Sequence, residues 1–206
     1  AEQFKMLYNE QRMNQGGDPY DYTVWNADTD WQDEMFQTGF LTNNTVSITA
    51  SGDRSKFYLG LGYVMEEGSI KSEKLNKFTV NLHSEHKVTD FLRFGFQVNG
   101  VRALYPDAKG VGSALKAAPI APVYDTESGL LHTLPDFQRA QVWNPMIEPV
   151  LRGAHNKSAN YRMAGNIYGE LDLMKNLTFK ATFSLDYASS QSRSYSPLIY
   201  VYNPDV

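Results

Sequence analysis

The chain has 206 residues, a formal net charge of −4 and 42% hydrophobic residues. Its mean hydropathy is −0.45, and no apolar run approaches the roughly 18 residues that a transmembrane helix needs, which excludes a helical membrane protein. With 19 Lys and Arg against 23 Asp and Glu, it carries no basic stripe, so we expect no nucleic-acid partner. The chain contains no cysteine, which excludes thiol catalysis and disulfides within it.

Residues 1–42 are predicted to form a loop with one short helix. Residues 4–15 place apolar side chains among helix formers, and Gly16-Gly17 would end that helix. No signal peptide opens the chain, so we expect it to be a piece of a longer protein. An acidic cluster in this region could bind calcium, but it lacks the spacing of an EF-hand loop. A solvated loop is the favoured interpretation, and calcium binding stays open for Asp28, Asp30, Asp33 and Glu34.

From residue 43 on, strips in which every second residue is apolar recur along the chain. Residues 43–104 hold four of them, at 45–51, 56–65, 77–84 and 91–104, which predict two hairpins. Two more strips follow at 159–172 and 177–189. Side chains alternate between the two faces of a strand, so each strip has an oily face and a wet face. We expect the wet face to carry Asn81, His83, Gln97, Asn99, Lys180 and Thr182.

The resulting fold class is all-β, an antiparallel meander of about six to seven strands. The alternation fits a soluble sheet and a transmembrane barrel equally well. The connections favour the barrel, because short turns alternate with long loops, the longest being residues 105–158 with a helix-prone patch. The strips are about as long as the 9 to 11 residues with which a tilted strand crosses a bilayer. Aromatic residues near their ends are typical of an interfacial girdle: Tyr58, Tyr63, Phe91, Tyr105, Tyr161 and Tyr187.

Seven short motifs in a fixed order resemble the early barrel of SusC/RagA-like TonB-dependent transporters. Each motif is weak alone, but their ordered succession covers nearly the whole chain and is specific. They are Thr29–Phe36, Val46–Gly52, Tyr58–Tyr63 with Glu67-Gly68, Ala117–Asp125, Asn144-Pro145, Gly165–Tyr168 and Asn176–Phe179. This sequence shows no plug domain and no TonB box.

The resemblance implies one part of an outer-membrane β-barrel of about 22 strands with a plugged lumen. It also implies import of glycans (oligosaccharides) or peptides, a SusD-like surface lipoprotein as a lid, contact with outer-membrane lipid, and no cofactor. The TonB complex would act through parts absent from this chain. Strand 45–51 would run towards the periplasm, residues 1–42 and 105–158 would be extracellular, and residues 159–206 would supply further barrel strands. The wet face would then line the lumen.

The long loop offers candidate ligand contacts. Three aromatic and three polar side chains could stack on and hydrogen-bond a sugar or peptide, or could pack the loop on itself or against the lid, and both alternatives stay open. They are Tyr124, Phe137, Arg139, Trp143, Asn144 and Arg152.

We predict neither a catalytic nor a metal site. Glu170 and Asp172 share a strand face, as a glycosidase pair could, but polar lining of a lumen is the stronger interpretation. The histidines are His83, His86, His132 and His155, and they form no HExxH-like pair. The competing functions are a soluble β-rich carbohydrate-active enzyme and an extracellular binding or adhesion module.

Overall fold

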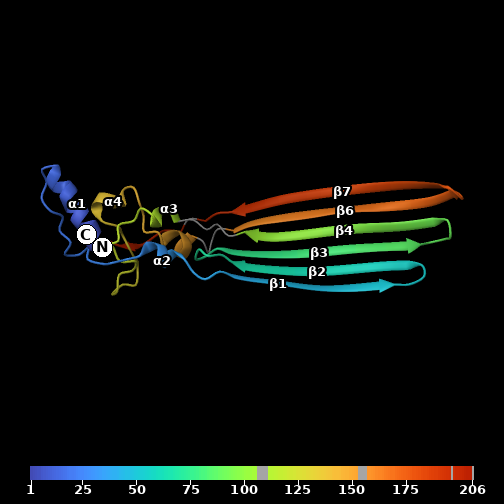
Figure 1. The fold of residues 1–206 in the computed structure, drawn as a ribbon, viewed down its shortest axis with the longest axis horizontal. Coiled ribbons are helices and arrows are strands. Elements are labelled where there is room, and N and C mark those ends of the chain that lie inside the picture. The colour runs from blue at the N-terminus through green and yellow to red at the C-terminus, as the bar shows by residue number, and fades with distance from the viewer. Residues whose placement is uncertain (106–110, 153–156, 196, 206) are drawn as a thin grey trace.

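The protein consists of a long antiparallel sheet with a compact unit at one end of its strands (Figure 1). The computed structural model describes residues 1–105, 111–152, 157–195 and 197–205. We call the compact unit the cap; it is built from residues 1–39, 68–73, 111–152 and 197–205. The side chain of Arg152 lies outside the described part of the chain.

The sheet is a six-stranded meander in which every neighbouring pair is antiparallel, as predicted. Most of the strands run several residues past the predicted strips, because their ends pair through the backbone even where the alternation of side chains fades. In spatial order they are β1 (Phe40–Ser51), β2 (Ser55–Glu67), β3 (Lys74–Lys87), β4 (Leu92–Tyr105), β6 (Lys157–Met174) and β7 (Leu177–Arg193).

The connections sort by length onto the two ends of the sheet. At the end away from the cap, three tight turns join β1 to β2, β3 to β4 and β6 to β7 (Figure 1). The first is closed by a 2.8 Å hydrogen bond from Gly52 N to Ser55 O, and the second by a 2.9 Å bond from Val88 N to Leu92 O. The longer connections all lie at the cap end, so the alternation predicted from the sequence is a real geometric feature.

The cap contains short helices and one small sheet. The helices are α1 (Glu2–Asn14), α2 (Trp31–Met35), α3 (Val111–Ala114), α4 (Asp136–Arg139) and the π-helix η1 (Glu148–Arg152). The small sheet pairs β5 (Leu131–His132) with β8 (Val201–Tyr202) in parallel. The chain leaves α1 at the predicted glycines, where Gly16 has a φ of 79° that suits a residue without a Cβ. Within the described part of the chain, none of the helices is both long enough and apolar enough to cross a membrane.

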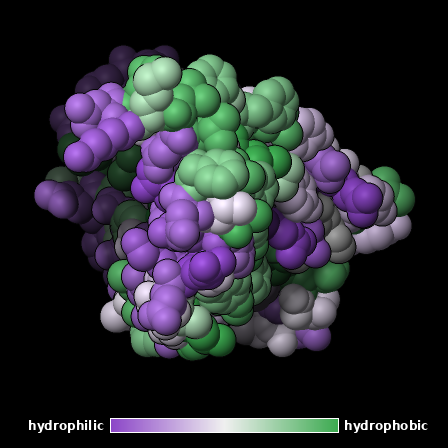
Figure 2. Space-filling view, turned by 90° about the vertical axis from the view of Figure 1, so that its right-hand side faces the viewer, coloured by the Kyte–Doolittle hydropathy of each residue, from purple (hydrophilic) through white to green (hydrophobic). Residues whose placement is uncertain are grey.

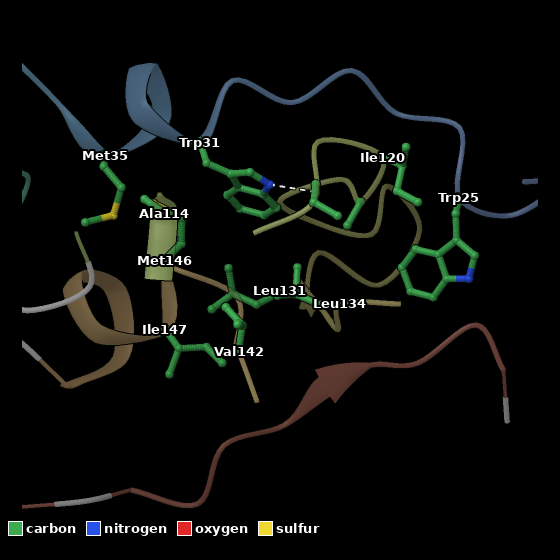
Figure 3. Close-up of a cluster of buried hydrophobic side chains, with 12 residues drawn as sticks. Trp25, Trp31, Met35, Ala114, Ile120, Leu131, Leu134, Val142, Met146 and Ile147 are labelled. Atoms are coloured by element: carbon green, nitrogen blue, oxygen red, sulfur yellow. Dashed lines mark hydrogen bonds between the residues drawn. The ribbon is translucent and has the colours of Figure 1, made fainter. Parts of the chain in front are cut away.

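Nearly all the buried apolar side chains of the described residues lie in the cap (Figure 3). They come from both the N-terminal segment and residues 111–147, which are far apart in the sequence. In the sheet, Ala103 is the one described hydrophobic residue that is buried. The sheet therefore presents both of its faces to the surroundings. The buried cap residues are Trp25, Trp31, Met35, Ala114, Ala118, Ile120, Ala121, Leu131, Leu134, Val142, Met146 and Ile147.

The end of the chain differs from its predicted place. We expected residues 159–206 to supply further barrel strands, but the large sheet ends with β7. Tyr202 O accepts a 2.9 Å hydrogen bond from Thr133 N, and Asp205 pairs with Arg139 at 2.8 Å. These cap contacts fix residues 197–205 beside β5 instead of beside β7.

Candidate functional site

One face of the large sheet is apolar across all six strands. Side chains of residues that pair directly across an antiparallel ladder lie on the same face, and the register joins apolar residues to one another. This face is also open: Ile48 is 58% exposed and Phe183 is 71% exposed. One row across the sheet reads Ile48, Leu59, Leu82, Val98, Gly165 and Leu185. In the view along the strands from the turn end, hydrophobic residues gather in a band beside hydrophilic ones (Figure 2).

The opposite face is polar. A row across it reads Thr49, Tyr58, His83, Gln97, Asn166 and Ser184. All six residues predicted for the wet face lie on this side of the sheet, since Asn81 pairs with Asn99, and Thr182 and Lys180 pair with Tyr168 and Glu170. The two-faced character predicted from the sequence therefore holds in three dimensions.

Charged side chains on the polar face form ion pairs across strands. Arg93 Nη2 lies 3.3 Å from Glu170 and 3.5 Å from Asp172, and Lys180 Nζ lies 2.7 Å from Glu170. The two carboxylates that share this strand face, Glu170 and Asp172, therefore both form ion pairs. This geometry favours a polar lining over an acid pair.

Of the predicted ligand contacts, Trp143 and Tyr124 have exposed aromatic rings, at 61% and 43%. Phe137 packs against the rings of Tyr8 and Tyr20, with centroids 4.4 and 5.2 Å away, and it holds α1 against α4. Arg139 Nη1 donates to Asn203 Oδ1 at 3.1 Å and to Asp205 Oδ2 at 2.8 Å. Phe137 and Arg139 therefore have structural partners inside the cap.

Asn144 is a correction to the predicted ligand set. It is 3% exposed, its Nδ2 donates to Val123 O and His132 O at 2.9 Å each, and its Oδ1 accepts from Met146 N at 2.9 Å. Every hydrogen-bonding group of the amide is occupied, so Asn144 holds the cap together and is closed to a ligand. Arg152 ends η1, and its role stays a prediction.

Polar contacts join the separate cap segments. Tyr20 Oη donates to Asp136 Oδ1 at 2.9 Å, linking the N-terminal segment to α4. Burial and this hydrogen bond raise the pKa of Tyr20 above its ordinary value, so the phenol stays protonated. In the 125–128 turn, hydrogen bonds from the hydroxyl and the backbone N–H of Ser128 lower the pKa of Asp125.

Asp30 and Glu34 of the acidic cluster near α2 have structural partners. Asp30 caps α2 by accepting from Gln32 N at 3.0 Å and from Asp33 N at 3.1 Å, and Glu34 pairs with Lys71 at 3.9 Å. Across residues 1–105, 111–152, 157–195 and 197–205, no three His, Asp or Glu side chains come together as a metal site would require. His155 lies outside the described residues.

The cap also holds a pocket of about 190 Å³, lined mostly by apolar side chains. His132 and Trp143 line it together with Leu134, Val142, Ile147 and Val201. Nothing in the sequence indicates this position of His132, whose imidazole suggests only a possible metal ligand. An irregular loop has no repeating pattern of apolar residues, so the sequence alone could not predict which of its residues meet in this pocket.

No family model matches the chain. It is 25% identical over 189 residues to TonB-dependent receptor P3 of Formosa agariphila, covering 85% of the chain and 18% of that receptor. It is 30% identical over 115 residues to TonB-dependent receptor SusC of Bacteroides thetaiotaomicron, covering 54% of the chain and 12% of SusC. The chain thus spans less than a fifth of these relatives.

Among solved structures, the RagAB peptide importer in its closed-closed state superposes with a TM-score of 0.66 at 18% identity. The match covers 81% of this chain and 20% of the importer chain. The resemblance to SusC/RagA-like TonB-dependent transporters is therefore confirmed. So is the fold class, a six-stranded antiparallel meander that matches part of a TonB-dependent β-barrel transporter.

Proposed function

We propose that this chain is part of a TonB-dependent importer in a bacterial outer membrane. The observation that carries the proposal is the register of the six strands, which gathers apolar residues on one face and polar residues on the other. A barrel in lipid needs this division, because its outer face meets hydrocarbon and its inner face meets water. The apolar face would contact lipid, and the polar face would line the lumen.

The placement of the connections supports one orientation. Outer-membrane barrels have short turns on the periplasmic side and longer loops outside. The three tight turns would then lie in the periplasm, and the cap would lie outside the cell. On this orientation β1 runs from the surface towards the periplasm.

We further propose that the cap meets a SusD-like surface lipoprotein and an oligosaccharide or peptide ligand. Trp143 and Tyr124 are the predicted contacts that keep exposed rings. The TonB complex would act through parts of the protein outside this chain. The names of the relatives support nutrient import in general, since one is SusC and another is a peptide importer.

The two alternative functions have weaker support. A soluble enzyme or an adhesion module would bury one sheet face in a core, whereas the apolar face here is open and the core lies in the cap. The acid pair that an enzyme would use is occupied by Arg93 and Lys180.

The orientation can be tested by labelling single cysteines, because the chain has none of its own. In the full-length protein, Leu115→Cys places a thiol on the exposed cap surface and Asp53→Cys places one in a tight turn. A bulky maleimide reagent that cannot cross the outer membrane should label the first on intact cells, and the second only after the outer membrane is permeabilised. Labelling of Asp53→Cys alone on intact cells would show that the chain has the opposite orientation. Equal labelling of both variants on intact cells would contradict a membrane location.

A further inference from the structure

The pocket in the cap is too small for a whole ligand but has room for one ring. Its volume of about 190 Å³ lies below the roughly 300 Å³ at which pockets for complete small molecules begin. Leu134, Val142, Ile147 and Val201 form apolar walls, and Trp143, which is largely exposed, stands at the rim. A pocket of this kind suits a single side chain or ring of a larger ligand.

One wall of the pocket carries an unused hydrogen-bond acceptor. His132 is only 4% exposed, and its ring is held between Trp25 and Tyr202 with both centroids 5.2 Å away. Its Nδ1 lies 3.0 Å from Thr133 O. A carbonyl oxygen can only accept, so Nδ1 carries the proton and Nε2 of the neutral ring keeps a lone pair. Among the residues that the structure describes, no group donates to Nε2.

A second polar group at the same pocket is also unused. Thr133 lines the pocket, and its Oγ1 is the one buried side-chain oxygen or nitrogen in the described chain without a hydrogen-bond partner. Buried polar groups in native proteins almost always have partners. Thr133 Oγ1 is itself shielded from solvent, so the accessible group without a hydrogen-bond partner among the described residues is Nε2 of His132. This nitrogen points to a ligand that brings a hydrogen-bond donor into the pocket.

The charges and the walls narrow the class of ligand. Arg139 lines the pocket, but its guanidinium is already paired with Asp205, so none of the described lining residues offers an unpaired Arg or Lys to a carboxylate. A sugar ring would bury several hydroxyl groups against apolar walls, and each would lose its hydrogen bonds to water. An aromatic ring with one O–H or N–H avoids both costs, because its body is apolar and its polar tip needs a single partner.

We infer that this pocket binds the side chain of a tyrosine or tryptophan in a peptide ligand, whose O–H or N–H donates to Nε2 of His132. The inference rests on the proposed function, because it takes the cap to be a surface that the imported ligand contacts. It chooses peptide over oligosaccharide as the substrate class.

The test uses the full-length protein purified in detergent and two small probes, N-acetyl-tyrosinamide and N-acetyl-phenylalaninamide, titrated by calorimetry or NMR. The tyrosine amide should bind about fivefold to tenfold more tightly, the ratio that one net hydrogen bond provides. His132→Phe keeps an aromatic ring but removes the acceptor, so it should abolish this ratio. Val142→Trp should fill the pocket and abolish binding of both amides. Leu115→Ala, an exposed apolar change elsewhere on the cap, should alter neither affinity.

Equal affinity for the two amides, or a ratio that survives His132→Phe, would overturn the inference, and so would displacement of the tyrosine amide by an oligosaccharide. If His132→Phe fails to fold, Val142→Trp and the two amides on the unchanged protein still decide the question. The outcome is separable from that of the cysteine labelling. If the thiols are labelled as expected but neither amide binds, only the proposed ligand of the pocket is wrong. If the amides bind as expected but both thiols are labelled equally, only the proposed importer function is wrong.

Discussion

Arginine at the middle of the apolar face should destabilise the membrane-embedded protein by about 2 to 4 kcal/mol. Leu59→Arg and Phe183→Arg test this directly, because both residues lie near the middle of their strands on the apolar face. The physical reason is that a guanidinium facing hydrocarbon loses its hydration without gaining a partner. Phe94 lies close to the turn end of β4, so Phe94→Arg should cost less, since the penalty falls to about 0 to 1 kcal/mol near the interface.

The matched controls are arginines at the same heights on the polar face. Asn81→Arg, Gln97→Arg and Thr182→Arg should each change the free energy of unfolding by roughly 0.5 kcal/mol or less, as exposed polar substitutions ordinarily do. Reversible urea unfolding of the full-length protein in lipid vesicles measures both sets. A large cost on both faces would mean that the polar face is buried against something other than water. A small cost on both would mean that neither face meets lipid.

How far the sequence predicted the sheet can be seen at particular residues. Side chains along a strand alternate between its two faces with a period of two residues. Neighbouring strands therefore need only pair apolar positions with apolar positions, and Leu59, Leu82 and Val98 do fall in one row across the sheet. A shift of one residue would send every apolar side chain to the polar face. The pattern therefore predicted the faces as well as the strands.

The cap could not be predicted in the same way, because its contacts join distant segments that carry no period. Ala27 N and Thr29 N donate to the carbonyls of Ile120 and Pro119, about 90 residues later in the sequence. In the sequence, the amide side chain of Asn144 is typical of a ligand contact. Its structural role follows only from the three hydrogen bonds that it makes in the folded cap. The aromatic rings differ for a similar reason, since Phe137 packs against Tyr8 of α1 whereas Trp143 is 61% exposed.

Trp31→Ala should unfold the cap while leaving the sheet assembled. Trp31 is 3% exposed, belongs to the cap core (Figure 3), and donates from Nε1 to Ala118 O at 2.9 Å. Removing a buried aromatic side chain of this size costs about 3 to 5 kcal/mol through lost burial and the cavity left behind. The backbone ladder between residues 27–29 and 118–121 should loosen with it. Hydrogen exchange of the full-length protein in detergent should show faster exchange in both segments and unchanged exchange in β2 and β3.

Trp143→Ala is the matched control for stability, because the same side chain is removed from a position that is 61% exposed, where substitutions cost about 0.5 kcal/mol or less. Trp31→Phe keeps an aromatic ring but loses the Nε1 donor and part of the indole, so it should destabilise the cap less than Trp31→Ala does. If the cap is where the surface lipoprotein docks, Trp31→Ala should also reduce co-purification of the lipoprotein, whereas Trp31→Phe should preserve most of it.

Unchanged hydrogen exchange in residues 118–121 after Trp31→Ala would show that the N-terminal segment and the long loop are stable independently of each other. In that case the cap would consist of two units that are in contact but fold independently, and Trp31 would not be the residue that joins them.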